Sequence, residues 1–514
     1  MIRTVSKPRC LVLPEAGFTP AAVDAVLDGP VRLALPTGWR KRVAASARAV
    51  ARIVSDGLPV YGINTGFGKL AQRSIAREAL AELQRNLILS HCVGVGEPLP
   101  DRVVRLVLAL KIASLARGHS GVRIATVEAL RALLGADALP VIPSQGSVGA
   151  SGDLAPLAHL TAAMMALGEI RLAGRPVAAS VALRRIGLEP VALGAKEGLA
   201  MINGTQVSTA LALDGLRQLR AVFAAAVVAG AMSVDAAAAS DTPFDDRLQR
   251  LRGHRGQRDV AACYRALLAG SPIRESHRTD DIRVQDPYSL RCQPQVMGAC
   301  LDQLRHAAGV LAVEANAITD NPIVFPDRGE ALSGGNFHAE PVALAADQLA
   351  IAMAEVGALS ERRVALLIDS SLSGLPPFLV PDAGLHSGFM IAHVTAAALA
   401  SENKSLAHPA SIDSLPTSAN QEDHVSMATF AARRLQPLAA NLRRIVAIEL
   451  LAAAQGIDLR RPLETAPAGR PARALVRRCA SFYARDRLFS PDIEAVAALI
   501  QDHAYVPFVG TLFD

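Results

Sequence analysis

The sequence has few aromatic residues, few charged residues and few cysteines for its length. Aromatic residues make up 4% and charged residues 19% of 514 residues. The cysteines contain no CxxC pair and are too dispersed for a disulfide scaffold, so we expect reduced thiols. They are Cys10, Cys92, Cys263, Cys292, Cys300 and Cys479.

The chain also lacks runs of like charge and long apolar runs. Its 53 basic and 47 acidic side chains give a net charge of +6, which argues against a nucleic-acid partner. Arg3, Lys7 and Glu15 interrupt the start of the chain where a signal peptide needs an apolar core. The longest apolar stretch, residues 221–234, is shorter than the roughly 18 residues that suggest a membrane span. We therefore expect a cytoplasmic protein with no membrane partner.

Apolar residues recur at helical spacing in several long segments, and hydrophobic residues make up 51% of the chain. The pattern predicts a mainly α protein. We expect an N-terminal, mainly helical and loop-rich region over residues 1–206, then a long central helical bundle and a C-terminal helical region over residues 207–514. The expected long helices cover residues 101–117, 303–318, 341–368 and 425–455.

Short segments rich in glycine, asparagine, serine and proline separate these helices and predict loops. Binding groups often lie on loops that a rigid scaffold holds, so these segments are the first functional candidates. They are YGINTGFG at 61–68, PSQGSVGASGDLAP at 143–156, NGTQ at 203–206 and SGGNFH at 333–338.

The segment 146–153 has two possible interpretations. Its glycines suit an anion-binding turn at the start of a helix, although no Lys-Ser or Lys-Thr follows as in a P-loop. The second interpretation is chemical: the unhindered amide nitrogen of Gly152 can attack the carbonyl carbon of Ala150 and close a five-membered ring. Loss of water from the ring and from Ser151 then leaves an electrophilic methylidene group.

The fourteen residues GSVGASGDLAPLAH, at 146–159, resemble the aromatic amino acid lyase family. Members of that family build a methylidene-imidazolone from Ala-Ser-Gly. The resemblance therefore implies an ammonia-lyase whose electrophile forms autocatalytically from Ala150, Ser151 and Gly152, with no external cofactor. No HExxH or Cys/His spacing supports a metal site, so we expect none.

The resemblance also assigns residues outside this loop. Tyr61 matches the family's essential loop tyrosine, which can act as a base only where positive charge or oriented donors stabilise its phenolate; alternatively, it only anchors a turn. In VQDPYSLRCQPQ, Asp286 and Pro287 predict the start of a short helix that Pro294 limits. Tyr288 and Arg291 then share one face.

By resemblance, Arg291 binds the substrate carboxylate, and Gln285 and Tyr288 line the site. The alternative for Arg291 is a surface ion pair with Asp286. Asn203 would orient the prosthetic ring or the substrate carboxylate, although Asn-Gly is often only a turn. Phe337 would lie against the substrate ring, or else pack in the core.

Two residues bear on which amino acid is the substrate. His91 matches the position at which the family distinguishes aromatic rings, and a histidine there favours a polar ring without excluding tyrosine. Glu422, in SANQEDHVSM, resembles the form found in the histidine-specific members. A carboxylate can pair with an imidazole N–H but would stay unpaired against a phenyl ring. A metal cluster or a solvated helix end are the alternatives for the Glu-Asp-His sequence.

The resemblance implies elimination of ammonia from L-histidine to give trans-urocanate, the first step of histidine degradation. It also implies a homotetramer whose active sites combine loops from more than one subunit. A tyrosine ammonia-lyase or a related aminomutase is the alternative enzyme. A helical scaffold protein that has no catalytic activity is the alternative outside the enzymes.

Overall fold

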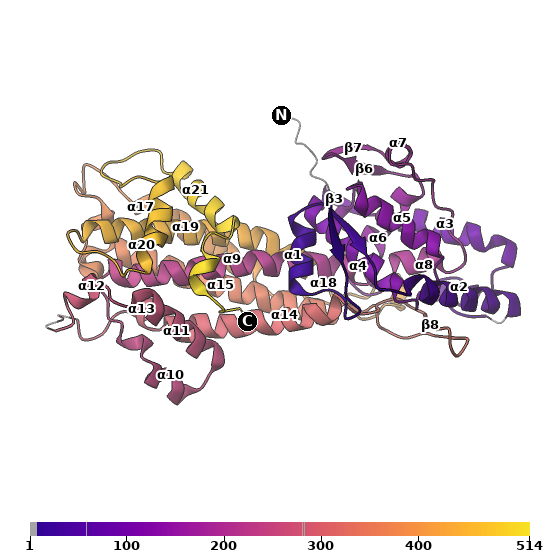
Figure 1. Ribbon diagram of the computed structural model, residues 1–514, viewed down its shortest axis with the longest axis horizontal. Coiled ribbons are helices and arrows are strands. Elements are labelled where there is room, and N and C mark those ends of the chain that lie inside the picture. The colour runs from indigo at the N-terminus through magenta and orange to yellow at the C-terminus, as the bar shows by residue number, and fades with distance from the viewer. Residues whose placement is uncertain (1–7, 58, 280, 282, 514) are drawn as a thin grey trace. The chain divides into compact units, whose positions relative to one another are not determined.

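The computed structural model describes residues 8–57, 59–279, 281 and 283–513. Most of the described chain is helical, and short two- and three-stranded sheets make up the rest (Figure 1). This confirms the prediction of a mainly α protein. The chain forms two compact units, which are described separately below.

Unit 1 contains residues 1–214, 308–347 and 409–433. Its first strands, β1 and β2, pair in parallel around α1, whose start is capped by Thr19 accepting a hydrogen bond from the backbone nitrogen of Ala22 at 3.2 Å. The α-helices and strands of this unit, including these three, are β1 (Arg9–Val12), α1 (Pro20–Asp28), β2 (Val31–Ala34), α2 (Trp39–Asp56), α3 (Leu80–His91), β3 (Val95–Pro98), α4 (Asp101–Ala116), α5 (Ile124–Gly135), β4 (Leu139–Pro140), β5 (Pro143–Gln145), α6 (Leu154–Met164), β6 (Glu169–Leu172), β7 (Arg175–Ala178), α7 (Ala179–Arg185), α8 (Glu197–Ile202), β8 (Ile323–Phe325), β9 (Glu330–Leu332) and α18 (Ala428–Arg433).

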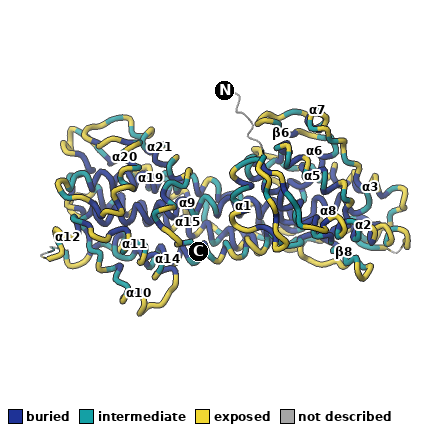
Figure 2. The backbone as a smooth tube through the Cα atoms, in the orientation of Figure 1, coloured by how far each residue is buried: buried dark blue, intermediate teal, exposed yellow. Residues whose placement is uncertain are grey.

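Unit 2 contains residues 215–307, 348–408 and 434–514 and is built from helices. Its core includes α19 (Leu435–Leu459), most of whose residues are buried (Figure 2). There the guanidinium of Arg363 pairs with the Glu449 carboxylate at 2.8 Å, with both side chains fully buried. Its helices are α10 (Asp246–Arg252), α11 (Arg255–Leu268), α12 (Pro272–Glu275), α13 (Tyr288–Arg291), α16 (Ser370–Ser373), α17 (Met390–Leu406), α19 (Leu435–Leu459), α20 (Gly469–Cys479) and α21 (Ser490–Gln501).

Three long helices contribute residues to both units: α9 (Gln206–Ala236), α14 (Gln293–Glu314) and α15 (Glu340–Ile368). By length and composition alone, two of them, α9 and α15, are long and apolar enough to cross a membrane. The apolar runs of the sequence did not suggest this. Their most apolar windows are 94% and 67% buried in the protein. Such burial is typical of core helices.

Element boundaries differ from the sequence-based expectations in three places. The helix expected over 303–318 begins earlier, at Gln293, and the segment expected as one helix over 425–455 is two helices separated at Arg434. The segment 143–156 begins with the short strand β5 before its loop. The boundary near residue 206 stays a prediction; the contact pattern ends the first segment of unit 1 at Asp214 and adds two later segments to it.

Candidate active site

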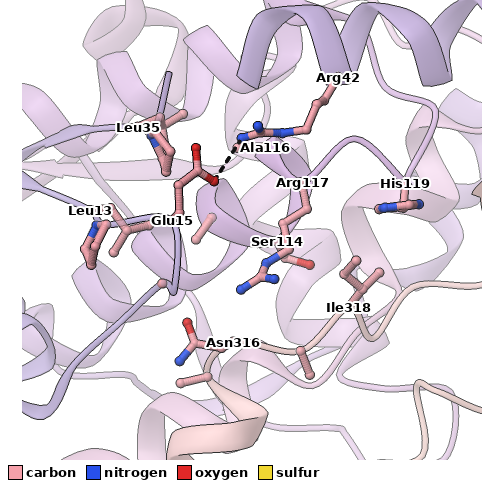
Figure 3. A pocket seen from close by; sticks show the side chains of 16 residues that line it. Leu13, Glu15, Leu35, Arg42, Ser114, Ala116, Arg117, His119, Asn316 and Ile318 are labelled. Atoms are coloured by element: carbon pink, nitrogen blue, oxygen red, sulfur yellow. Dashed lines mark ion pairs between the residues drawn. The ribbon is translucent and has the colours of Figure 1, made fainter. Parts of the chain in front are cut away.

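A cavity of about 930 Å³ in unit 1 brings together most of the residues predicted from the sequence. Those lining it are Tyr61, His91, Ala150, Ser151, Asn203, Phe337 and Glu422. A second cavity, of about 240 Å³, holds none of them (Figure 3). There Glu15 faces Arg42, with a carboxylate oxygen 3.9 Å from the guanidinium. The larger cavity is therefore the candidate active site.

The loop that carries Ala150, Ser151 and Gly152 is fixed on one side by the turn at residues 203–204. Asn203 donates a hydrogen bond from Nδ2 to the Ser151 carbonyl oxygen at 2.8 Å, and the Asp153 nitrogen donates to the Gly204 carbonyl oxygen at 2.8 Å. Gly152 has a φ of +72°, and a Cβ there would lie 2.4 Å from the backbone of Gly204. Only glycine fits this close approach.

The residues before α18 hold the other side of the loop. The Met427 nitrogen donates to the Val148 carbonyl oxygen at 2.8 Å, and Ser426 donates from Oγ to the Gly149 carbonyl oxygen at 2.9 Å. A Cβ on Gly149 would lie 2.4 Å from Ser426 Oγ. The electrophile loop is thus held between two chain segments that are distant in sequence.

Glu422 and Ser151 contact each other in the cavity. Ser151 donates from Oγ to one carboxylate oxygen of Glu422, and the other oxygen accepts bonds from Thr417 Oγ1 at 2.7 Å and Ser418 Oγ at 2.9 Å. Burial favours the neutral acid, but these hydrogen bonds outweigh it and hold the pKa of Glu422 below its ordinary value. Glu422 is therefore anionic at neutral pH.

A strained turn precedes this carboxylate. Residues 418–420 all have positive φ angles, from 50° to 65°, and none of them is glycine. Such backbone costs free energy and is common where surrounding structure fixes a functional side chain. Here the turn brings the Ser418 hydroxyl to Glu422.

His91 ends α3 and lines the same cavity. Its Nδ1 lies 2.8 Å from the Leu87 carbonyl oxygen, as expected for a donated hydrogen bond, which leaves Nε2 as the free acceptor. Burial lowers the pKa of His91, against the opposing effects of that bond and of the Glu422 charge. A neutral imidazole beside an anionic carboxylate can bind a polar ring.

Tyr61 lies in the loop that joins α2 to the next helical segment. Its hydroxyl oxygen accepts a hydrogen bond from the Gly68 nitrogen at 3.3 Å, an oriented donor of the kind that a phenolate requires. Lys69, next in the chain, donates from Nζ to the Ala419 carbonyl oxygen at 2.6 Å and so links this loop to the Glu422 turn.

The predicted carboxylate-binding residues lie in unit 2, and none of them lines the cavity. The short helix is confirmed as α13, and the Arg291 guanidinium carbon lies 4.5 Å from the Tyr288 ring centre, so the two share a face. Gln285 and Tyr288 are exposed. The buried Nε of Arg291 has no hydrogen-bond partner among the described residues.

The predicted role of Asp286 as helix cap is wrong. Pro287 occupies the cap position, and the buried Asp286 carboxylate instead accepts a bond from the Ser240 nitrogen at 2.7 Å. The short helix ends at Arg291, before Pro294, as predicted, and α14 then begins at Gln293 with this proline in its first turn, where proline is tolerated.

The Aromatic amino acid lyase family model matches residues 18–478. The chain belongs to the aromatic amino acid lyase family. It is 62% identical to a histidine ammonia-lyase of Burkholderia cenocepacia, over 93% of this chain and 94% of that protein. The solved histidine ammonia-lyase of Trypanosoma cruzi is 42% identical, with a TM-score of 0.90 over 98% of this chain and 96% of that one. The tyrosine aminomutase of Streptomyces globisporus is 34% identical, with a TM-score of 0.92 over 99% of both chains.

Two buried residues of this family member support the site without having been predicted. Asp153 accepts four hydrogen bonds that tie the electrophile loop to α9 and α18. Lys111 on α4 donates from Nζ to the Asn203 carbonyl oxygen at 2.8 Å. A lone lysine within the apolar stretch 101–116 is the sequence signal that points to it.

Replacing Lys111 tests whether this buried lysine supports the site through Asn203. Burial lowers the pKa of Lys111 to about 8. The unfolded chain keeps the lysine proton up to about pH 10.4, so the free energy of unfolding should rise between pH 8 and that value because the unfolded state binds more protons. We expect Lys111→Met to remove roughly 3 kcal/mol of this rise and to lower kcat, because Asn203 loses its anchor.

Denaturant unfolding at pH 7 to 10.5 measures the effect, with the exposed Lys41→Met as control. A pH profile of unfolding in Lys111→Met that matches that of the wild type would contradict the assignment.

Proposed function

We propose that the protein eliminates ammonia from L-histidine to give trans-urocanate, and that it acts in the cytoplasm. The observation that carries the proposal is the carboxylate of Glu422, which Thr417 and Ser418 hold by hydrogen bonds beside Ser151 and in the same cavity as His91. An imidazole N–H can satisfy this carboxylate, whereas a phenyl ring would leave it unpaired. The high identity to relatives named histidine ammonia-lyase supports the same substrate.

Residues Ala150, Ser151 and Gly152 form the proposed methylidene-imidazolone. The Gly152 nitrogen bonds to the Ala150 carbonyl carbon, and two waters leave, one from the new ring and one from the Ser151 side chain. Three features fit this group: the left-handed conformation of Gly152, its contact with Gly204, and the bond from Asn203 to the Ser151 carbonyl oxygen. Once formed, the group supplies the electrophile that captures the substrate.

The remaining residues bind the substrate and move its proton. Tyr61 takes the β-proton, with the Gly68 N–H stabilising its oxygen. Glu422 and His91 hold the imidazole ring, Phe337 contacts it, and Asn203 orients the reacting groups. Glu422 lines the same cavity as Tyr61 and is the second group there that can carry a proton.

We further propose that the active sites are shared within a homotetramer. The buried Nε of Arg291 has no hydrogen-bond partner among the described residues. Its guanidinium stacks on the ring of Tyr288, a residue that is 69% exposed. Large apolar side chains are also exposed along α15, at Leu344 and Ile351, seven residues apart on one helix face. Burying such surfaces between copies supplies both the association energy and the missing carboxylate-binding groups.

The prosthetic group is tested by intact mass. Cyclisation and dehydration should leave the purified chain about 36 Da lighter than its sequence mass, the mass of two waters. Ser151→Ala retains the ring-forming backbone but cannot form the methylidene, so its deficit should be at most one water. An unmodified wild-type mass would refute both the electrophile and the ammonia-lyase function, in favour of a scaffold without catalysis.

The substrate is tested by comparing products from L-histidine and L-tyrosine. We expect urocanate to form at least about 10³ times faster than coumarate or β-tyrosine, because the wrong ring leaves buried polar groups unpaired. In Glu422→Gln, which keeps the side-chain volume, urocanate formation should fall by about 10² or more while the mass deficit persists. The structural likeness to a tyrosine aminomutase makes tyrosine the second candidate, and faster turnover of tyrosine would establish it.

Sharing of the site is tested by complementation. Ser151→Ala and Arg291→Met chains should each be nearly inactive alone. If a site takes its electrophile from one chain and its arginine from another, co-expression at equal amounts should restore about one quarter of the wild-type activity. Co-expression of Ser151→Ala with Glu422→Gln, both lining one cavity, is the matched control and should restore nothing if these two groups come from one chain. Equal results for both pairs would contradict the shared site.

A further inference from the structure

Two histidines and a glutamate come together at the margin of the candidate active site. These are His338, Glu340 and His424, and their ligand atoms all lie within 4.8 Å of one another. His338 and His424 line the active-site cavity, and their ring centres are 5.6 Å apart. None of the three has a role in the proposed elimination of ammonia.

Glu340, the first residue of α15, has a buried carboxylate oxygen whose loss of hydration no hydrogen bond offsets. Its buried Oε2 has no hydrogen-bond partner among the described residues. The Asp347 carboxylate, two helical turns further along α15, adds negative charge nearby. A buried carboxylate oxygen without a donor is costly, and a cation would remove the cost.

The histidine rings are arranged so that they can act as ligands. Nε2 of His338 lies 3.2 Å from the backbone carbonyl oxygen of His424. A hydrogen bond donated there fixes the tautomer and leaves the lone pair on Nδ1, as is common for metal-binding histidines. His424 is exposed, so its ring is free to turn toward the other two ligands.

We propose that His338, Glu340 and His424 bind one divalent transition-metal ion. Bond lengths of about 2.0–2.2 Å to each ligand require the three atoms to approach to roughly 3.3 Å, a closure that side-chain rotation of His424 can supply. Two imidazoles and one carboxylate favour zinc, cobalt or nickel over magnesium or calcium. The ligands come from two segments separated in sequence, which is why no motif spacing revealed them.

The bound ion would hold together the two segments that carry Phe337 and Glu422. Phe337 precedes His338 directly, and Glu422 lies two residues before His424. Metal binding therefore stabilises the wall of the active-site cavity. Three protein ligands also leave a coordination position open for water or another small ligand.

Cobalt binding to the full-length protein tests the proposal. We expect one Co²⁺ per chain with the visible absorption of a four- or five-coordinate ion, displaced by Zn²⁺ and unaffected by Mg²⁺. His338→Gln and His424→Gln should weaken binding by about 10² or more, and Glu340→Gln by about tenfold or more. His306→Gln, which alters an exposed histidine of α14 outside the cluster, is the matched control and should bind as the wild type does.

Two further measurements do not depend on the variants' folding. Saturating Zn²⁺ should raise the wild-type Tm by several degrees. X-ray absorption of the wild-type zinc complex should show nitrogen and oxygen ligands and no sulfur. Absence of Co²⁺ binding in the wild type, unchanged binding in both histidine variants, or sulfur ligation from a cysteine would each overturn the proposal.

Discussion

The candidate active site depends on one buried carboxylate, that of Asp153. It accepts hydrogen bonds from Ser147 Oγ at 3.1 Å, Thr429 Oγ1 at 2.8 Å, and the Ser208 nitrogen and Oγ at 2.7 and 2.6 Å. A fully buried carboxylate is tolerated only with such compensation. Because the donors belong to the electrophile loop, to α9 and to α18, satisfying this one group fixes all three segments relative to one another. The backbone of a glycine-rich loop would otherwise have many conformations.

Helix starts explain why polar groups can gather in so apolar a unit. The first backbone N–H groups of a helix have no partner within the helix. Next to the loop in sequence or through its hydrogen bonds, α6 begins at Leu154, α9 at Gln206 and α18 at Ala428. The Ser208 nitrogen, in the first turn of α9, is one such group, and it donates to Asp153. The start of α9 thus supplies hydrogen-bond donors to the carboxylate that holds the loop.

The sequence predicted the parts of the site that lie in short polar segments, and it missed those that depend on contacts distant along the chain. Tyr61, His91, Asn203, Phe337 and Glu422 line one cavity. The sequence pointed to them through the family resemblance of the short segments that carry them. The pairing of Gly152 with Gly204, and the reach of the α4 lysine to the Asn203 carbonyl, depend on tertiary packing that no local pattern encodes. Helix boundaries failed for the same reason: periodicity continues through the break at Arg434.

Arg291 is not among the residues that line the cavity, and its buried Nε has no hydrogen-bond partner among the described residues. An arginine that binds a carboxylate must keep donors free, and a donor kept free inside one chain is a cost to that chain's stability. Stacking on the Tyr288 ring supports the guanidinium from one side without using its hydrogen bonds. This arrangement suits the carboxylate-binding role proposed for Arg291. In the proposed homotetramer a second copy covers this surface, and exclusion of water there would strengthen every charged interaction at the site.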